Sequence, residues 1–286
     1  MRCPIRDSKI CADKEVTTVE ETRISEPMIR VKELYKIYKM GETKVHALDG
    51  VDFEIRQGEF CAITGPSGSG KSTLLNMLAG LEHPTKGEIV IAGKHIEKLN
   101  EKQLVAFRRD RVGFIFQSYN LIATMNALEN VALPLSFRGI PRAERLKRAK
   151  EYLKLVGLEA FMNHMPNQMS GGQQQRVGIA RALAMDPQII FADEPTGNLD
   201  SKTTMEVLRL MQKIVKERNQ TLVMVTHDNN LATYADRIFK IIDGKIVHIE
   251  ENHKEVDLIA LEQIYESGGV SVAAVNLTET KGREEV

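Results

Sequence analysis

Short apolar runs and helix-like stripes alternate along the central part of the chain. VDFEI (51–55) alternates apolar and polar residues with period two, which predicts a strand with one buried face. Later runs are apolar at almost every position, as expected of strands covered on both faces of a mostly parallel sheet. The pattern therefore predicts an α/β fold, and its later runs are FCAIT (60–64), FIFQ (114–117), IIFAD (189–193) and LVMVTH (222–227).

Apolar residues at helical spacing predict three amphipathic helices between these strands. Their stripes are Leu74, Leu75, Leu78 and Leu81; Leu146, Ala149, Leu153 and Val156, ended by Gly157; and Val207, Leu208, Met211, Ile214 and Val215. No strand pattern interrupts residues 118–170, and Pro141 suits the first turn of a helix there. We therefore expect a mainly helical insertion over that stretch.

The two ends of the chain differ from its centre in composition. Residues 1–27 are charged and poor in large apolar side chains, which predicts a flexible N-terminal extension. Residues 251–286 combine a short helix-like stretch, VDLIALEQIY, with glycines and a polar finish, and we interpret them as an appended tail. The domain itself should therefore occupy residues 28–250.

The overall composition argues against several classes of protein. Lys and Arg number 39, as do Asp and Glu, so no excess of positive charge indicates nucleic acid as a partner. No run approaches the roughly 20 apolar residues that a membrane-spanning helix needs, so we expect the chain not to cross a bilayer itself. Cys3, Cys11 and Cys61 match neither a disulfide framework nor paired metal-ligand spacing, which indicates a reducing compartment.

A glycine-rich segment, GPSGSGKS, matches the pattern G-x-x-x-x-G-K-[ST] between an apolar strand and a helix. Backbone N–H groups of such a loop, together with the start of the following helix, bind phosphate oxygens. The Lys71 ammonium can reach the β- and γ-phosphates, and the Ser72 hydroxyl can bind Mg²⁺. The predicted ligand is therefore a nucleoside triphosphate, and its predicted contacts are Gly65, Pro66, Ser67, Gly68, Ser69, Gly70, Lys71, Ser72 and Thr73.

Polar residues at the ends of three strand-like runs are candidate catalytic groups. Asp193 and Glu194 end a buried run, where one carboxylate can hold the metal and the other can orient attacking water. We assign the metal to Asp193 and the role of general base to Glu194. His227 ends LVMVTH at the same sheet edge and is expected to contact the γ-phosphate, while Gln117 is a candidate ligand of Mg²⁺ or of the attacking water. Solvated acids, a structural histidine and an ordinary loop glutamine are the alternatives.

A second glycine-containing element, MSGGQ, has two interpretations. Ser170 and Gln173 have the spacing of a capping box at the start of a helix. Gly171 and Gly172, however, each cost the helix roughly 1 kcal/mol relative to alanine without improving the cap. Their bare N–H groups suit a phosphate, yet the first loop already encloses one triphosphate. We therefore expect this element to serve the nucleotide of another chain, with a plain helix cap as the alternative.

In combination, these motifs resemble those of the ATP-binding subunits of ABC transporters over about residues 28–250. GPSGSGKST, Gln117, MSGGQ, IIFADEP, GNLD and His227 occur together in that family's order. The resemblance implies a P-loop NTPase fold with a RecA-like, mostly parallel sheet core, an antiparallel β subdomain and an inserted α-helical subdomain. It also implies ATP and Mg²⁺ as cofactors, and catalytic roles for Glu194, His227, Gln117 and Lys71.

The resemblance further implies a head-to-tail dimer that encloses two ATP molecules. Each ATP would lie between the phosphate-binding loop of one copy and the Ser170–Gln173 segment of the other. Tyr38 is then expected to stack on adenine, with simple core or surface packing as the alternative. Asn198–Asp200 is expected to form a turn that communicates across the dimer, with Asp200 at the nucleotide. Met169 stands where the family usually has leucine, and the similar volume of the two side chains predicts little effect.

Two longer segments, FIFQSYNLIATMNALENVALPL and ADEPTGNLD, are most similar to the lipoprotein-releasing and macrolide-export branch, which includes a cell-division relative that controls cell-wall hydrolases. This implies a peripheral protein on the cytoplasmic face of the membrane that powers a separate integral membrane permease. Leu121, Ile122 and Met125 would then suit a contact with a cytoplasmic helix of the permease, with burial in the helical insertion as the alternative.

Transport and signalling to a hydrolase stay open as alternatives, because the membrane partner selects the substrate. DNA-repair or ribosome-associated relatives predict tandem ATPase halves, zinc motifs or a basic linker, and none of these is visible in the sequence. A small-molecule kinase would leave MSGGQ and His227 without a role.

Overall fold

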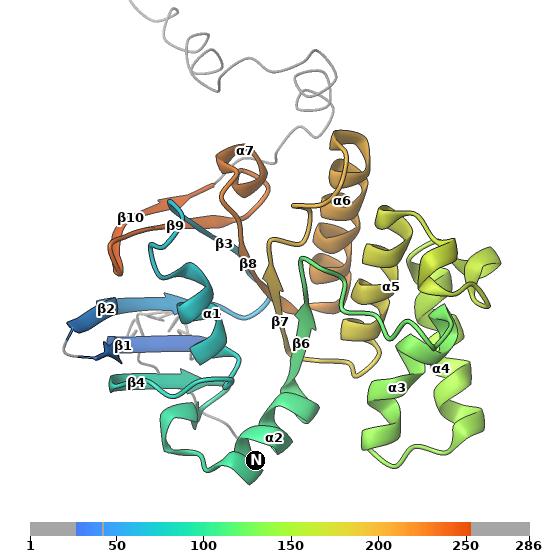
Figure 1. The fold of residues 1–286 in the computed structure, drawn as a ribbon, viewed down its shortest axis with the longest axis horizontal. Coiled ribbons are helices and arrows are strands. Elements are labelled where there is room, and N and C mark those ends of the chain that lie inside the picture. Colours follow the sequence, from blue (N-terminus) through green and yellow to red (C-terminus); the bar gives the residue numbers. More distant parts are fainter. Residues whose placement is uncertain (1–26, 42, 253–286) are drawn as a thin grey trace, which may run out of the picture.

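Two β-sheets and a layer of helices form the part of the chain that the computed structural model describes, residues 27–41 and 43–252 (Figure 1). The predicted N-terminal extension, apart from residue 27, lies outside these residues, as do Cys3 and Cys11. So does the predicted tail, apart from residues 251 and 252. The predicted domain bounds therefore stay a prediction.

The larger sheet has the strand order β10-β9-β3-β8-β7-β6. Strands β9, β3, β8, β7 and β6 pair in parallel, and β10 runs antiparallel to β9. This mostly parallel sheet confirms the predicted α/β fold. Its strands are β3 (Phe60–Thr64), β6 (Val112–Ile115), β7 (Ile189–Asp193), β8 (Thr221–Val225), β9 (Arg237–Ile242) and β10 (Lys245–Glu251).

Side chains of the parallel strands alternate between two hydrophobic cores. One core receives Cys61, Ile63, Ile189, Phe191, Val223 and Val225. The other receives Phe60, Ala62, Ile190, Ala192, Leu222 and Met224. Burial on both faces is the reason that these runs are apolar at almost every position.

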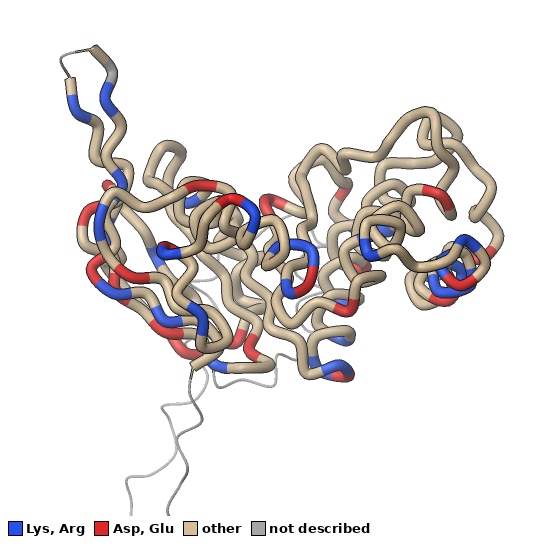
Figure 2. Tube along the Cα trace, turned by 90° about the horizontal axis from the view of Figure 1, so that it is seen from below, with Lys and Arg blue, Asp and Glu red and all other residues tan. Residues whose placement is uncertain are grey.

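The smaller sheet is antiparallel, with the order β2-β1-β4-β5. The pairing of β1 with β4 ends at Tyr35, whereas its pairing with β2 continues to Met40. The far end of the β1–β2 hairpin therefore projects from the body, as Figure 2 shows, with charges of both signs interspersed over the rest of the trace. The elements are β1 (Ile29–Met40), β2 (Thr43–Ile55), β4 (Lys86–Ile91) and β5 (Lys94–His95), followed by η1 (Ile96–Lys98) and α2 (Glu101–Arg111).

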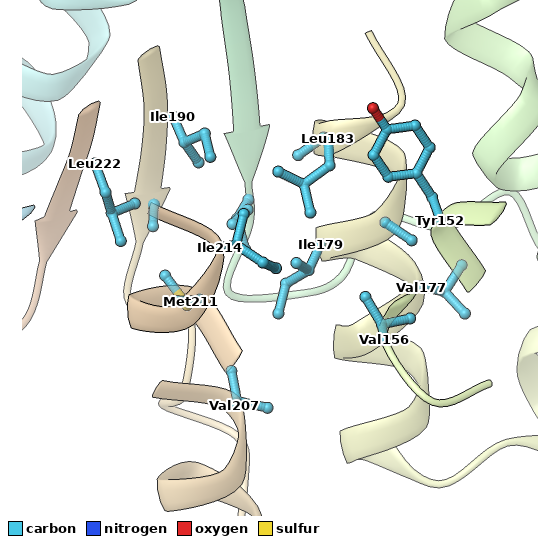
Figure 3. Close-up of a cluster of buried hydrophobic side chains, with 14 of the residues drawn as sticks. Tyr152, Val156, Val177, Ile179, Leu183, Ile190, Val207, Met211, Ile214 and Leu222 are labelled. Carbon is cyan, nitrogen blue, oxygen red and sulfur yellow. The ribbon is translucent and has the colours of Figure 1, made fainter. Parts of the chain in front are cut away.

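Helices cover both faces of the larger sheet. Helix α1 (Lys71–Leu78) contributes to the core shared by the two sheets, and the other core is closed by α5 and α6. Figure 3 shows Ile179 and Leu183 of α5 meeting Ile214 of α6 in front of the sheet residues Ile190 and Leu222. The remaining helices are α3 (Ala127–Phe137), α4 (Arg142–Leu155), α5 (Gly171–Leu183), α6 (Ser201–Arg218) and α7 (Asn229–Ala232), with η2 (Glu159–Phe161) and η3 (Pro166–Gln168).

The helices follow the apolar stripes with small differences. Residues 118–170 contain helices and no strand, and α3 and α4 pack on α5, which continues the same layer. Pro141 is the N-cap of α4 rather than a residue of its first turn. Leu81, expected on the buried face of α1, lies beyond the end of the helix and is 52% exposed, because Gly80 at φ 64° turns the chain away.

Two structural facts bear on the predicted reducing compartment and on the prediction that the chain does not cross a bilayer. Cys61 is a free, buried thiol in β3. Among the described residues, none of the helices combines the length and the apolar character needed to cross a bilayer.

Candidate active site

The phosphate-binding loop connects β3 to α1, and different constraints favour glycine at its different glycine positions. Gly65 (φ 154°) and Gly70 (φ 102°) have no room for a side chain, because a Cβ would lie 2.1 Å from the Ile241 carbonyl oxygen and 2.3 Å from the Ala47 carbonyl oxygen, respectively. Gly68 (φ 78°) faces open space, so only its left-handed backbone favours glycine. The neighbouring β-elements therefore fix the two ends of the loop and leave its tip uncovered.

Lys71 is the first residue of α1, and its side chain folds back over the loop. Its Nζ donates to the carbonyl oxygens of Gly65 (2.8 Å) and Pro66 (2.7 Å), and the residue is only 7% exposed. Ser69 is also buried, and its Oγ has no hydrogen-bond partner among the described residues. The Lys71 ammonium thus lies at the loop, bonded to two of its carbonyl oxygens, where it is available to a phosphate bound by the loop.

Tyr38 lies on the projecting hairpin beside the end of this loop. Its hydroxyl donates to Glu82 Oε2 (2.7 Å), and Lys36 Nζ lies 2.9 Å from Glu82 Oε1. Burial, followed by the hydrogen bond to Glu82, raises the pKa of Tyr38, while the nearby Thr73 side chain opposes the shift. The contact with Thr73 places the ring next to the phosphate-binding loop. Its predicted role in adenine stacking stays a prediction.

The acidic residues stand at the end of β7. Burial, followed by the Glu194 charge, raises the pKa of Asp193, and the Lys71 charge acts in the opposite direction. Asp193 is thus a partly desolvated carboxylate that shares the field of the loop lysine. Glu194 has φ 43° and follows the last residue of the strand, so the alternation of strand side chains ends at Asp193.

His227, Glu194 and Gln117 meet at this edge of the sheet. His227 Nδ1 lies 3.0 Å from Glu194 Oε1, and the His227 side chain is 65% exposed. A Cβ on Gly197 would lie 2.9 Å from Gln117 Nε2 and 3.5 Å from Glu194 Oε2, so both side chains converge on that glycine. Asn198 Nδ2 donates to the Gln117 carbonyl oxygen (3.0 Å) and ties this segment to the turn after Glu194.

The Ser170–Gln173 segment forms the capping box that its spacing predicts. Gln173 N donates to Ser170 Oγ (3.3 Å), and Ser170 N donates to Gln173 Oε1 (2.9 Å). The two glycines have a reason within the chain: a Cβ on Gly171 would lie 2.7 Å from Tyr119 OH, and one on Gly172 would lie 2.3 Å from Thr203 Cγ2. Close packing of α5 on its neighbours therefore explains why glycines stand at these two positions despite their cost to helix stability. Anion binding is not needed to explain them.

Asp200 caps the neighbouring helix. Its side chain accepts from Thr203 N (3.0 Å) and from Thr203 Oγ1 (2.7 Å), and the bond from the Thr203 amide is the main reason that the pKa of Asp200 is lowered. The N-termini of α5 and α6 thus lie side by side, each with a side-chain cap. A contact of Asp200 with nucleotide stays a prediction.

Within one chain, the sheet separates the helices that follow the two glycine-containing elements. Helix α1, which follows the phosphate-binding loop, and helix α5, which follows Ser170, lie on opposite sides of strands β6–β8 (Figure 1). They also belong to different hydrophobic cores. The structure thus gathers five predicted residues near the phosphate-binding loop, and strands of the larger sheet separate α1 from α5, the helix that Ser170 caps. The five are Lys71, Asp193, Glu194, His227 and Gln117.

Comparisons with known proteins identify the family of this chain. Residues 48–197 match the family described as ABC transporter. An uncharacterized ABC transporter ATP-binding protein of Thermotoga maritima is 52% identical over 223 residues, which cover 78% of this chain and 95% of that protein. This chain belongs to the ABC transporter family. It is the ATP-binding, ATP-hydrolysing subunit of a transporter.

Solved structures place the same domain in a dimeric context. The dimeric structure of the ABC cassette MJ0796 of Methanocaldococcus jannaschii, in a post-hydrolysis state bound to ADP and Pi, shares 48% sequence identity with a TM-score of 0.74, covering 79% of this chain and all of that one. The macrolide export ATP-binding/permease protein MacB of Hyphomonas neptunium is 43% identical over 87% of this chain, which spans 38% of that protein. The P-loop NTPase fold of this ABC subunit is thus confirmed.

Several residues that shape the site gave no signal in the sequence motifs. Arg181 donates to the turn after Gln117, Tyr119 touches Gly171, and Glu82 holds Tyr38. Asn130 is fully buried and exchanges four hydrogen bonds with the backbone of Ile122, Met125 and Asn126. A polar residue inside an apolar helix stripe was the one available hint, and it applied only to Asn130.

Exchanging Gly172 for alanine should destabilise this ABC subunit, because the added methyl group collides with Thr203 Cγ2. Overpacking of this kind costs about 1–3 kcal/mol. Adding Thr203→Ser removes the colliding methyl group and keeps the hydroxyl bonded to Asp200, so the double variant should be at least as stable as Thr203→Ser alone, because alanine favours the helix by roughly 1 kcal/mol over glycine. Urea denaturation measures both. Equal loss in the single and the double variant would contradict the packing explanation.

Asp193→Asn should raise the free energy of unfolding of the nucleotide-free protein at pH 7. The folded-state pKa of Asp193 is raised, so its ionisation opposes folding above that pKa, and the effect disappears as the pH falls through the unfolded-state value. Urea denaturation at pH 7 and near pH 4 should therefore give a gain that shrinks in acid. Glu88→Gln, at an exposed carboxylate of β4, is the matched control and should change stability by less than about 0.5 kcal/mol. If the increase in the free energy of unfolding were the same at both pH values, the ionisation of Asp193 would not be its cause.

Proposed function

We propose that two copies of this subunit pair head to tail and bind two ATP molecules between them. The carrying observation is that one chain holds a complete phosphate-binding loop and a capped, glycine-bearing helix start that are separated by strands of the larger sheet. Each copy then lends Ser170–Gln173 and Asp200 to the ATP that lies in the loop of the other. The dimeric state of the MJ0796 cassette supports this pairing.

Mg²⁺ is the metal that fits the oxygen donors at this edge. Ser72, Gln117 and Asp193 offer a hydroxyl, an amide and a carboxylate oxygen, which are hard ligands of the kind that Mg²⁺ takes together with water and phosphate. Among the described residues, no group of three His, Cys, Asp or Glu side chains is placed to hold a metal on its own. When bound, Mg²⁺ neutralises charge on the β- and γ-phosphates.

Hydrolysis would use Glu194 as general base. Its Oε1 lies 3.0 Å from His227 Nδ1, so the histidine would orient the carboxylate, and its 65% exposure would leave it accessible to the γ-phosphate. Gly197 lies where the Glu194 and Gln117 side chains converge, and a Cβ there would lie 2.9 Å from Gln117 Nε2. Lys71 binds the phosphates through the ammonium that now caps two loop carbonyls.

Glu194→Gln should keep ATP binding and slow hydrolysis by about 10²–10⁴-fold, the usual contribution of general-base catalysis. The dimer should then accumulate in the presence of ATP, and gel filtration with ATP detects it. Ser170→Arg should prevent this dimer and leave nucleotide binding by the monomer unchanged. A Glu194→Gln protein that stays monomeric in saturating ATP would argue against the head-to-tail site.

An apolar groove on this subunit fits a helix of a membrane partner. The groove of 390 Å³ lies between α2, β6, α3 and α5 and is lined by Val105, Val112, Phe114, Pro134 and Phe137 with arginines at its edge. Phe137 is 69% exposed and Val105 53%. Of the residues that the sequence suggested for this contact, Leu121 packs partly against the helical core and Ile122 is 37% exposed. The groove is thus lined by residues other than those that the sequence suggested.

The partner that we propose is an integral membrane permease of the macrolide-export or lipoprotein-releasing type. The similarity to MacB proteins, whose names join an ATP-binding part to a permease, supports this branch. The subunit would then lie on the cytoplasmic face of the membrane, bound through the groove. Closing and opening of the dimer during ATP binding and hydrolysis would move the permease, and the permease would select the substrate.

Phe137→Asp should shift the protein from the membrane fraction to the soluble fraction of its own cells, because a carboxylate in the groove opposes docking of an apolar helix. Val247→Asp is the matched control, since Val247 is 54% exposed on β10, outside the groove. Both variants should hydrolyse ATP as purified proteins. Retention of Phe137→Asp in the membrane fraction to the same extent as Val247→Asp would exclude this groove as the contact.

A further inference from the structure

A strained turn follows Gln117. Tyr119 (φ 60°) and Asn120 (φ 49°) both adopt the left-handed conformation, and neither is glycine. Consecutive residues of this kind are unfavourable unless their surroundings hold them. Within the turn, Asn120 N donates to the Ser118 carbonyl oxygen (2.6 Å) and Tyr119 N to the Phe116 carbonyl oxygen (3.3 Å).

Arg181 of α5 holds this turn from outside. One guanidinium donates through Nη2 to the Tyr119 carbonyl oxygen (2.8 Å) and through Nη1 to the Asn120 carbonyl oxygen. Gly178, one turn earlier on α5, lies beside the turn, and a Cβ there would be in ordinary van der Waals contact with the Tyr119 carbonyl oxygen at 3.8 Å. Burial lowers the pKa of Arg181, which indicates that these bonds form in a largely desolvated setting. Both carbonyls of the strained turn thus depend on one side chain.

The position of Gln117 depends on this turn in two ways. The turn begins two residues after Gln117 and fixes the direction in which the chain leaves it. The Tyr119 hydroxyl also lies 3.5 Å from the Asn198 carbonyl oxygen, and Asn198 Nδ2 holds the Gln117 carbonyl oxygen. Loss of the turn would therefore release Gln117 on both sides.

We propose that Arg181 is a positioning residue for Gln117: its guanidinium holds the Tyr119–Asn120 turn in the left-handed conformation and thereby keeps the Gln117 amide at the metal edge of the site. This rests on the proposed role of Gln117 toward Mg²⁺. A residue that orients a metal ligand typically changes metal affinity or activity by about 10–100-fold when it is lost.

The test compares Arg181→Met with Arg176→Met in the full chain, without a membrane partner because Arg181 also lines the groove. Arg176 lies on the same helix and bonds the Val156 carbonyl oxygen and Glu206, away from Gln117. Hydrogen exchange of residues 117–122 in the nucleotide-free, metal-free protein should accelerate at least about tenfold in Arg181→Met and stay unchanged in Arg176→Met. The Mg²⁺ concentration that half-saturates hydrolysis should rise about tenfold in Arg181→Met, with little change in the KM for ATP.

A double-variant cycle with Gln117→Ala separates positioning from a general loss of structure. If Arg181 acts through Gln117, Arg181→Met adds little to the defect of Gln117→Ala, and Arg181→Lys, which keeps one donor, is intermediate. Wild-type exchange and Mg²⁺ dependence in Arg181→Met, or a defect fully additive to that of Gln117→Ala, would overturn the proposal. Unchanged Mg²⁺ dependence in Gln117→Ala itself would instead overturn the proposed metal role, and the inference with it.

Discussion

The parallel register of β3, β8, β7 and β6 is the constraint on which the active site depends. Parallel strands end at one edge of a sheet, so the segments that follow them start side by side. The phosphate-binding loop follows β3, Asp193 ends β7, His227 follows β8 and Gln117 follows β6. A slip of one residue would turn each strand's apolar set to the wrong core. Burial on both faces therefore fixes the register, and the register fixes the site.

The caps of helices α5 and α6 also bear on function. Ser170 and Asp200 each hold the first turn of a helix through their own side chains, and Gly172 lets the two helix starts approach through Thr203. Groups that the fold already orders lose little conformational freedom on binding. The surface proposed to face the ATP of a second copy is thus preorganised by interactions that also stabilise the monomer.

Helix α5 connects features that are far apart on the surface. Its N-terminus carries Ser170, Arg181 near its other end holds the turn after Gln117, and the same guanidinium lines the apolar groove. One rigid element therefore passes beside the proposed second-copy surface, the metal edge and the proposed permease contact. Helix α5 thus offers a direct physical connection between the proposed ATP site and the proposed permease contact.

By itself, the sequence determined the α/β class, the strands of the parallel sheet, the phosphate-binding loop, the acidic strand end and the capping box, because each is set by periodicity or by residues a few positions apart. The tertiary structure decided the rest. The bond between Tyr38 and Glu82 joins residues 44 positions apart, and Arg181 reaches a turn 62 positions away. The tertiary structure also showed why glycine stands at positions 171 and 172. Local sequence rules could not show this, because the steric limit arises only when a distant side chain packs against the glycine.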